Sequence, residues 1–185
     1  MKSETGSGKT LTYLIPLIEH LHNYSITEEL ITRDKGTYCI IFSPTRELCV
    51  QIDIEMQKLL KLFHFIVCST IMGGENPKKE KARLRKGCTV LVCTPGRFLY
   101  HLKNTKAITL SKLQYLIIDE ADRMLDMGFE KEMNECLQLI KRRCPDKFTQ
   151  EPDLYHSSSI KINFVSATIS PRVASLGAKL MKDYE

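Results

Sequence analysis

A glycine-rich run near the start of the sequence has the composition and spacing of a phosphate-binding loop. Residues 3–10 open a stretch with helical periodicity and resemble a Walker A loop, in which Lys9 reaches the β- and γ-phosphates and Thr10 binds Mg²⁺. Glycines let the backbone wrap around the anion, and the positive end of the following helix faces it. The predicted nucleotide-binding residues are Thr5, Gly6, Ser7, Gly8, Lys9 and Thr10. The alternative is a Gly/Ser turn before an ordinary helix.

Neighbouring carboxylates follow the apolar run 113–118, which we interpret as a strand. They belong to the segment Asp119-Glu120-Ala121-Asp122, which resembles a Walker B segment. In open α/β sheets, ligands bind at the carboxyl ends of the strands. Asp119 is therefore predicted to hold a hydrated magnesium ion, and Glu120 to orient or deprotonate the attacking water. The alternative is a solvated helix cap.

The candidate residues require a scaffold that positions them, and the sequence predicts a three-layer α/β fold. Short β-rich runs alternate with helical stretches, which is typical of a mostly parallel sheet with helices on both faces. The predicted strands are 37–42, 65–71, 88–93, 113–118 and 160–165. The predicted helices are 9–23, 46–63, 77–86, 128–142 and 171–183. Two polar segments, 24–36 and 143–159, are predicted to be surface loops.

Length and composition indicate one globular domain over residues 1–185, with a core of its own. No apolar run approaches the length of a membrane-spanning helix, so we expect no membrane partner. The seven cysteines are scattered without zinc-site spacing and are expected to be reduced and mostly buried. The formal net charge of +5 is compatible with a polyanionic partner and does not establish one.

Six short motifs in order make the chain similar to the DEAD-box RNA helicases, a family named after the word Asp-Glu-Ala-Asp. In addition to that word at 119–122, the motifs are 5–10, 44–48, 73–74, 94–97 and 166–168. The resemblance covers nearly the whole chain. It implies a RecA-like P-loop NTPase fold, ATP and Mg²⁺ as cofactors, and RNA as partner. It also implies a second RecA-like domain that completes the enzyme.

The resemblance also assigns roles to individual residues. Lys9, Asp119 and Glu120 are the implied catalytic residues, and Asp122, Ser166 and Thr168 are implied to link the state of the nucleotide to RNA binding. The implied RNA-binding residues are Pro44, Thr45, Arg46, Gly73, Gly74, Thr94, Pro95, Gly96 and Arg97. These turns follow predicted strands and offer backbone N–H groups beside arginines, which suits phosphates and carries little base specificity. The plainer interpretation of 44–47 and 94–97 is a helix start, the latter with a proline in its first turn.

A basic run, formed by Lys78, Lys79, Lys81, Arg83, Arg85 and Lys86, follows the Gly73-Gly74 pair. Such a run is more often a solvated helix face than a binding site. The stretches 80–87 and 101–106 resemble the nucleolar branch of the family that assists assembly of the large ribosomal subunit. That resemblance implies pre-ribosomal proteins as partners and a location in the nucleus, within the nucleolus.

The chain departs from the family pattern at both ends. We expect residues 1–185 to include neither the adenine-recognising segment that precedes residues 5–10 in the family nor the second RecA-like domain. We therefore expect residues 1–185 alone to be nearly inactive as an ATPase. Two other classes stay open: a non-catalytic RNA-binding scaffold that retains the fold, and a P-loop ATPase that acts on DNA or protein.

Overall fold

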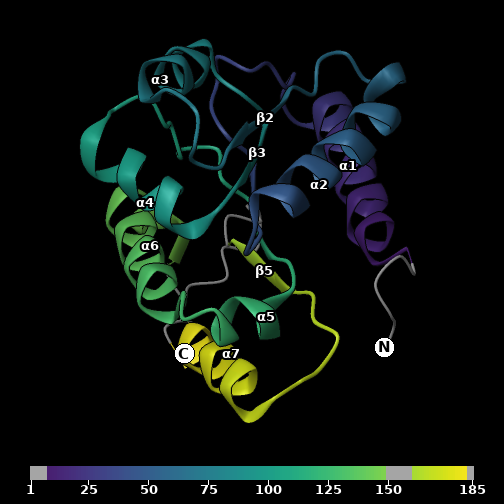
Figure 1. Ribbon diagram of the computed structural model, residues 1–185. Coiled ribbons are helices and arrows are strands. Elements are labelled where there is room, and N and C mark those ends of the chain that lie inside the picture. Colours follow the sequence, from purple (N-terminus) through teal and green to yellow (C-terminus); the bar gives the residue numbers. More distant parts are fainter. Residues whose placement is uncertain (1–7, 149–159, 183–185) are drawn as a thin grey trace.

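A five-stranded parallel sheet forms the centre of the molecule (Figure 1). The computed structural model describes residues 8–148 and 160–182. The strands are β1 Cys39–Phe42, β2 Cys68–Ile71, β3 Val90–Cys93, β4 Tyr115–Ile118 and β5 Lys161–Phe164. They are arranged in the order β2-β3-β1-β4-β5, and every pairing is parallel. All five carboxyl ends therefore meet at one edge of the sheet, and the predicted motifs are positioned there.

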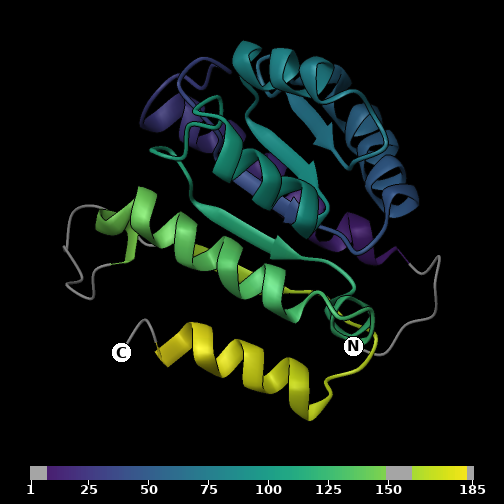
Figure 2. The same ribbon diagram turned by 60° about the vertical axis from the view of Figure 1, so that its left-hand side comes forward.

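Helices cover both faces of this sheet and complete three layers (Figure 2). The helices are α1 Lys9–Thr27, α2 Arg46–Leu59, α3 Pro77–Lys86, α4 Pro95–Asn104, α5 Ala121–Asp126, α6 Glu130–Arg143 and α7 Pro171–Lys182. Helices α1 and α2 pack on one face, where Cys39, Ile41 and Val92 point. The other helices contribute to the core on the opposite face, where Ile40 and Phe42 point. Successive strand residues alternate between two buried cores, as a sheet covered on both sides requires.

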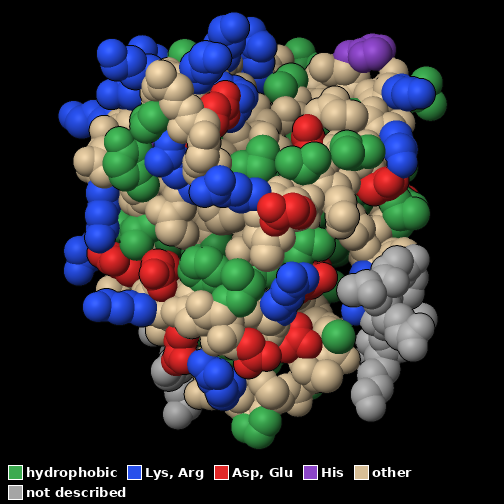
Figure 3. All heavy atoms as spheres, in the orientation of Figure 1, with side chains coloured by type: hydrophobic (Ala, Val, Ile, Leu, Met, Phe, Trp, Pro, Cys, Tyr) green, Lys and Arg blue, Asp and Glu red, His purple; other side chains and the backbone are tan. Residues whose placement is uncertain are grey.

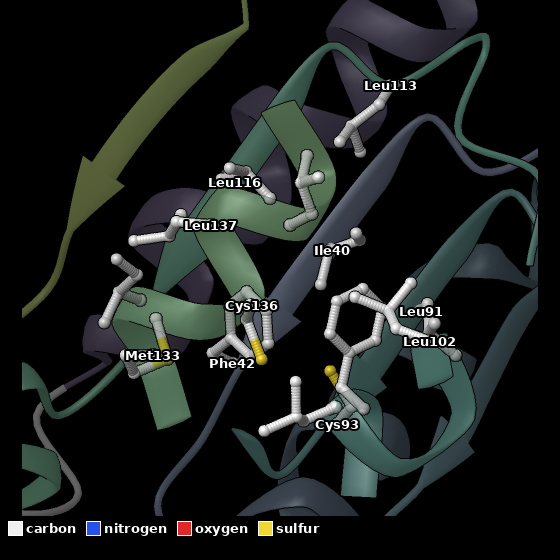
Figure 4. Packing of buried hydrophobic residues seen from close by; sticks show 14 of the residues in the cluster. Ile40, Phe42, Leu91, Cys93, Leu102, Leu113, Leu116, Met133, Cys136 and Leu137 are labelled. Atoms are coloured by element: carbon white, nitrogen blue, oxygen red, sulfur yellow. The ribbon is translucent and has the colours of Figure 1, made fainter. Parts of the chain in front are cut away.

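The larger core lies between the sheet and the helices α4 and α6. Phe42 of β1 and Phe98 of α4 meet edge to face with ring centroids 5.2 Å apart, and both side chains are fully buried. Around this aromatic pair, Cys93, Met133 and Cys136 fill the space between the layers (Figure 4). Dense packing of this kind fixes the starts of α4 and α6 relative to the strand ends, and so fixes the site.

The structure confirms the α/β fold and all five predicted strands, each shorter than predicted. It corrects the helices in three places. The predicted helix 46–63 ends at Leu59 and continues as a short 3₁₀ helix, Leu60–Leu62. The predicted loop 24–36 begins as the last turn of α1 and contains the fully buried Ile31, which anchors it to the core. Helices α4 and α5 were not predicted as elements.

The structure describes only part of the second predicted loop, 143–159. Its first residues contain a 3₁₀ helix, Pro145–Phe148, while 149–159 lie outside the described residues. Six of the seven cysteines are buried and Cys68 is half-buried, which confirms that they are mostly buried. Within the described ranges, no helix is both long and apolar enough to cross a bilayer.

Candidate functional site

The first helix begins at Lys9, within the last residues of the predicted phosphate loop. Gly8 caps α1 with a φ of 81°, and Lys9 is the first helical residue. Positive φ favours glycine, so the local sequence explains why the chain enters the helix here. Of the predicted loop, Gly8, Lys9 and Thr10 are described, whereas Thr5, Gly6 and Ser7 lie outside the described residues. The loop's conformation stays a prediction.

The carboxylate of Asp119 lies directly beyond β4 and faces α1. It is only 6% exposed, and its Oδ2 atom accepts a hydrogen bond of 3.0 Å from the Tyr13 hydroxyl. Its other oxygen accepts one from the Glu120 N–H. Burial raises the pKa of Asp119, while the hydrogen bonds and the positive charge of Lys9 counteract this only in part. A buried carboxylate of this kind is stabilised by a cation, which suits a metal ligand.

Tyr13 is a site residue that the sequence did not reveal. It lies one turn after Lys9, is 7% exposed, and reaches Asp119 across 106 positions of the chain. Burial raises the pKa of its phenol above the ordinary value, and the Asp119 charge raises it further. The hydroxyl therefore stays protonated and donates to Asp119. An aromatic residue in an apolar helix stretch gave no signal of this contact.

Glu120 has an unusual backbone. Its φ of 47° makes it the one non-glycine residue with a positive φ in the part of the chain that the structure describes. Such strain persists only where the surroundings enforce it, and it concentrates at functional sites. The Glu120 carboxylate lies 3.1 Å from Nη1 of Arg123, one turn along α5. The predicted catalytic carboxylate is thus held by a strained turn at the strand end.

The third acidic residue of the segment binds the chain that follows β5. Oδ2 of Asp122 accepts hydrogen bonds from the Thr168 N–H at 3.0 Å and the Thr168 hydroxyl at 2.8 Å. The Asp122 N–H donates to Oγ of Ser166, which itself donates to the Thr168 carbonyl. Burial raises the pKa of Asp122, but these hydrogen bonds outweigh burial and hold it below its usual value. The three predicted coupling residues form one network.

The turn after β1 starts α2 and places Arg46 against the turn after β2. Thr45 caps α2 by accepting a hydrogen bond from the Leu48 N–H, so the plainer helix-start role is present. The Arg46 guanidinium lies over Gly73 and Gly74, whose φ values are 75° and 76°. A side chain at Gly74 would overlap this guanidinium. The turn after β1 and the turn after β2, which were predicted separately from the sequence, therefore lie side by side and form one continuous surface.

The turn after β3 starts α4, with Thr94 as the N-cap and Pro95 in the first turn, as the plainer interpretation held. Gly96 is exposed beside them. Arg97 does not extend into solvent: its side chain is 16% exposed, and its Nε lies 2.5 Å from Oε2 of Glu80 on α3. Its Nη2 also donates to the Glu75 carbonyl in the turn after Gly74, at 3.4 Å. Arg97 thus lies beside this turn, with its guanidinium already hydrogen-bonded within the protein.

Glu80 is the second residue that the sequence did not single out. Its carboxylate is fully buried, and it accepts hydrogen bonds from Arg97, from His101 at 2.8 Å and from the Met72 N–H at 3.3 Å. Burial raises the pKa of Glu80, but the hydrogen bonds and charges of His101 and Arg97 outweigh it and lower the pKa. Glu80 thus joins the turn after β2 to helix α4. It stands within a basic run, which hid it.

Within the described residues, no group of three or more His, Cys, Asp or Glu side chains could hold a metal ion. A magnesium site at this edge would depend on Asp119 together with Thr10 and the ligand's own phosphates. The domain has three layers: a parallel sheet with the strand order β2-β3-β1-β4-β5 and helices on both of its faces. Its motifs follow the carboxyl ends of the strands, and together these features define an α/β domain of the RecA-like class.

Comparison with known proteins gives the family. The model of the DEAD/DEAH box helicase family matches residues 1–176, and the chain belongs to this family. It is 46% identical over 179 residues to the "ATP-dependent DNA helicase DDX31" of Dictyostelium discoideum, covering 96% of this chain and 18% of that protein. It is 41% identical over 194 residues to the "ATP-dependent RNA helicase dbp7" of Aspergillus oryzae, covering 99% of this chain and 25% of that protein. The chain thus spans about a fifth to a quarter of these relatives.

Solved structures agree with this family. The yeast DEAD-box splicing factor Prp28 matches with a TM-score of 0.80 at 27% identity, covering 96% of this chain and 38% of that chain. A DEAD box protein from the hyperthermophile Methanococcus jannaschii matches with a TM-score of 0.74 at 32% identity, covering 100% of this chain and 43% of that chain. Both likenesses extend over essentially the whole of this chain, so the fold class is confirmed.

Proposed function

We propose that the chain is the ATP-binding domain of an ATP-dependent DEAD-box RNA helicase, which hydrolyses ATP and remodels RNA duplexes or ribonucleoprotein. One observation carries this proposal: the five strand ends bring a buried carboxylate, the start of α1 and the glycine turns to a single edge of the sheet. Membership of the family supports it.

On the nucleotide side, Lys9 and Thr10 at the start of α1 would bind the phosphates of ATP and, with Asp119, its Mg²⁺. The bound ion would polarise the phosphates and neutralise their charge. The buried Asp119 carboxylate, with a raised pKa and a fixed Tyr13 donor, suits such an ion. Glu120, held at a strained turn beside it, is proposed to orient the water that attacks the γ-phosphate.

On the nucleic-acid side, the proposed contacts are with the phosphate and sugar backbone. The exposed guanidinium of Arg46 over the turn at Gly73 and Gly74, and the start of α4 at Thr94, offer donors suited to phosphates. Arg97 is proposed to contribute chiefly by holding α4 against the glycine turn, because Glu80 and the Glu75 carbonyl already occupy its guanidinium. The Asp122–Thr168 network is proposed to transmit the state of the nucleotide to this surface.

RNA and DNA have to be distinguished by experiment, because one relative is named a DNA helicase and another an RNA helicase. We expect ATP hydrolysis by a longer protein that carries this chain and a second RecA-like domain to be stimulated by single-stranded RNA. The same sequence as DNA should stimulate it far less, since the 2′-hydroxyl distinguishes the two in backbone recognition. Equal stimulation by DNA would contradict the assignment of RNA.

The cellular role is proposed to be in assembly of the large ribosomal subunit, with pre-ribosomal proteins as partners and the nucleolus as location. Its support is the resemblance of the stretches 80–87 and 101–106 to that branch of the family. The rival class, a non-catalytic scaffold, would need no nucleotide chemistry. Titration calorimetry with Mg-ATP on a longer protein that carries this chain separates the two, because a scaffold that has lost nucleotide binding should give no binding heat.

A further inference from the structure

A basic groove lies at the end of the molecule opposite the motifs. It has a volume of 750 Å³ and is formed where α3, α4 and α6 approach or reach their C-terminal ends. Five of its lining residues are cations, and none is acidic: Lys81, Arg85, Lys103, Lys106 and Arg143. Figure 3 shows Lys and Arg side chains gathered over α3 and along the side where α4 and α6 lie.

Part of this positive charge is explained by the fold itself. Lys103 and Arg143 occupy the last turns of α4 and α6, where cations stabilise the negative end of the helix dipole. Lys103 pairs with Glu135 at 2.6 Å, and the Arg143 guanidinium donates to the Leu102 carbonyl. These two cations serve the structure and hold the groove's walls together.

Arg85 also lies in a last turn, that of α3, but the helix dipole does not explain the other two cations. Lys81 lies in the middle of α3 and Lys106 lies beyond the end of α4, so the helix dipole accounts for neither. Lys81, Arg85 and Lys106 form no ion pair with any residue that the structure describes. Solvent screens the repulsion between these cations, since Arg85 and Lys106 are exposed, but together they give the groove a positive potential that attracts an anionic ligand.

The row of cations along α3, which joins the groove to the glycine turn, indicates which kind of anion the groove binds. Helix α3 starts three residues after Gly74, and the exposed Lys78 and Lys79 occupy its first turn. Its ten residues extend about 15 Å from the glycine turn towards the groove. Cations therefore line α3 from the proposed RNA turn to the groove, which a strand of phosphates could follow and a compact anion could not.

From this arrangement we infer that the groove lined by Lys81, Arg85 and Lys106 is an accessory binding site for the phosphate backbone of single-stranded RNA. The inference rests on the proposed RNA-helicase function and extends it. RNA that contacts the glycine turn continues along α3 and places further phosphates in the groove. The site adds affinity without reading bases, and only RNA long enough to reach it gains from it.

The test compares two triple variants of a longer protein that carries this chain and a second RecA-like domain, by fluorescence anisotropy with single-stranded RNA. Lys81→Glu/Arg85→Glu/Lys106→Glu reverses the groove, and Lys58→Glu/Lys61→Glu/Lys131→Glu makes the same charge change at exposed sites on other faces. For an RNA of about 20 nucleotides at about 0.1 M salt, the groove variant should bind about 10- to 100-fold more weakly, with the salt slope lowered by about 2. An RNA of about 5 nucleotides, which covers the motif turns alone, should bind both variants alike.

Each outcome decides the question. Equal affinity of the two variants for the long RNA would overturn the groove and leave the proposed function intact, whereas no RNA binding by the unmodified longer protein would overturn both. Binding of poly-glutamate as tightly as RNA would assign the groove to an acidic protein segment instead. Circular dichroism checks the fold of each variant, and the Gln triple at the same groove positions gives the result with a smaller charge change.

Discussion

At the scale of single residues, the candidate site consists of side chains that are fixed by partners far away in the sequence. Asp119 could be predicted because carboxylates after an apolar strand are a recognisable pattern. Tyr13 could not, because its contact with Asp119 spans 106 positions and exists only once β4 lies against α1. Glu80 was hidden for the same reason, since its partners Arg97 and His101 belong to another helix.

The adjacent glycines Gly73 and Gly74 allow a prediction with a built-in control. Both have positive φ, so either substitution by alanine should cost roughly 1 kcal/mol of stability through backbone strain. Only the new methyl group at position 74 overlaps the Arg46 guanidinium, which has to move. Gly74→Ala should therefore weaken RNA binding by about 10-fold, as expected for one lost charge-assisted hydrogen bond, and Gly73→Ala much less. Equal RNA affinities in a binding titration would refute the role of Arg46.

At the scale of elements, the sequence predicted what periodicity can show. All five strands and the helix Pro77–Lys86 were placed, the latter with its observed bounds. Helix α5 was missed because it has only six residues and begins at a strained Glu120, and α4 was recognised only by its N-cap at Thr94. The first predicted loop was wrong at its start, because periodicity alone gave no stop signal at Thr27.

The contact between α3 and α4 through Glu80 leads to a stability prediction. Glu80→Gln removes a fully buried carboxylate from Arg97 and His101 and should lower the free energy of unfolding at pH 7 by about 2–3 kcal/mol. Glu135→Gln is the matched control, because its pair with Lys103 is half-exposed and should contribute less than about 1 kcal/mol. Urea unfolding of the two variants measures the difference, and equal losses would contradict a structural role for Glu80.

The same substitution has a pH dependence with a defined sign. The folded pKa of Glu80 lies below its unfolded value near 4.5, so its stabilisation is present above that pH and is lost as pH falls through the folded pKa. The deficit of Glu80→Gln should therefore shrink in acid below about pH 4.5. The groups that face this carboxylate are Arg97 and His101, with Glu75 and Arg83 paired beside them.

At the scale of the whole molecule, parallel topology turns scattered motifs into one surface. Because all five described strands run the same way, every loop that follows a strand opens at one edge, and residues from Gly8 to Thr168 meet there. The opposite edge holds the ends of the crossover helices, and with them the basic groove. The sequence predicted the first arrangement through its motif order. It could not predict the second, because three helix ends from different parts of the chain form it.

The central claim is that the carboxylates after β4 perform ATP hydrolysis while the neighbouring turns bind RNA. The most direct test is RNA-stimulated ATP turnover by a longer protein that carries this chain with its second domain. Glu120→Gln keeps the shape of the side chain and removes its basicity, so it should lower turnover by about 10²- to 10⁴-fold while Mg-ATP and RNA still bind. Glu135→Gln should turn over ATP at the unmodified rate. Undiminished turnover by Glu120→Gln would contradict the account.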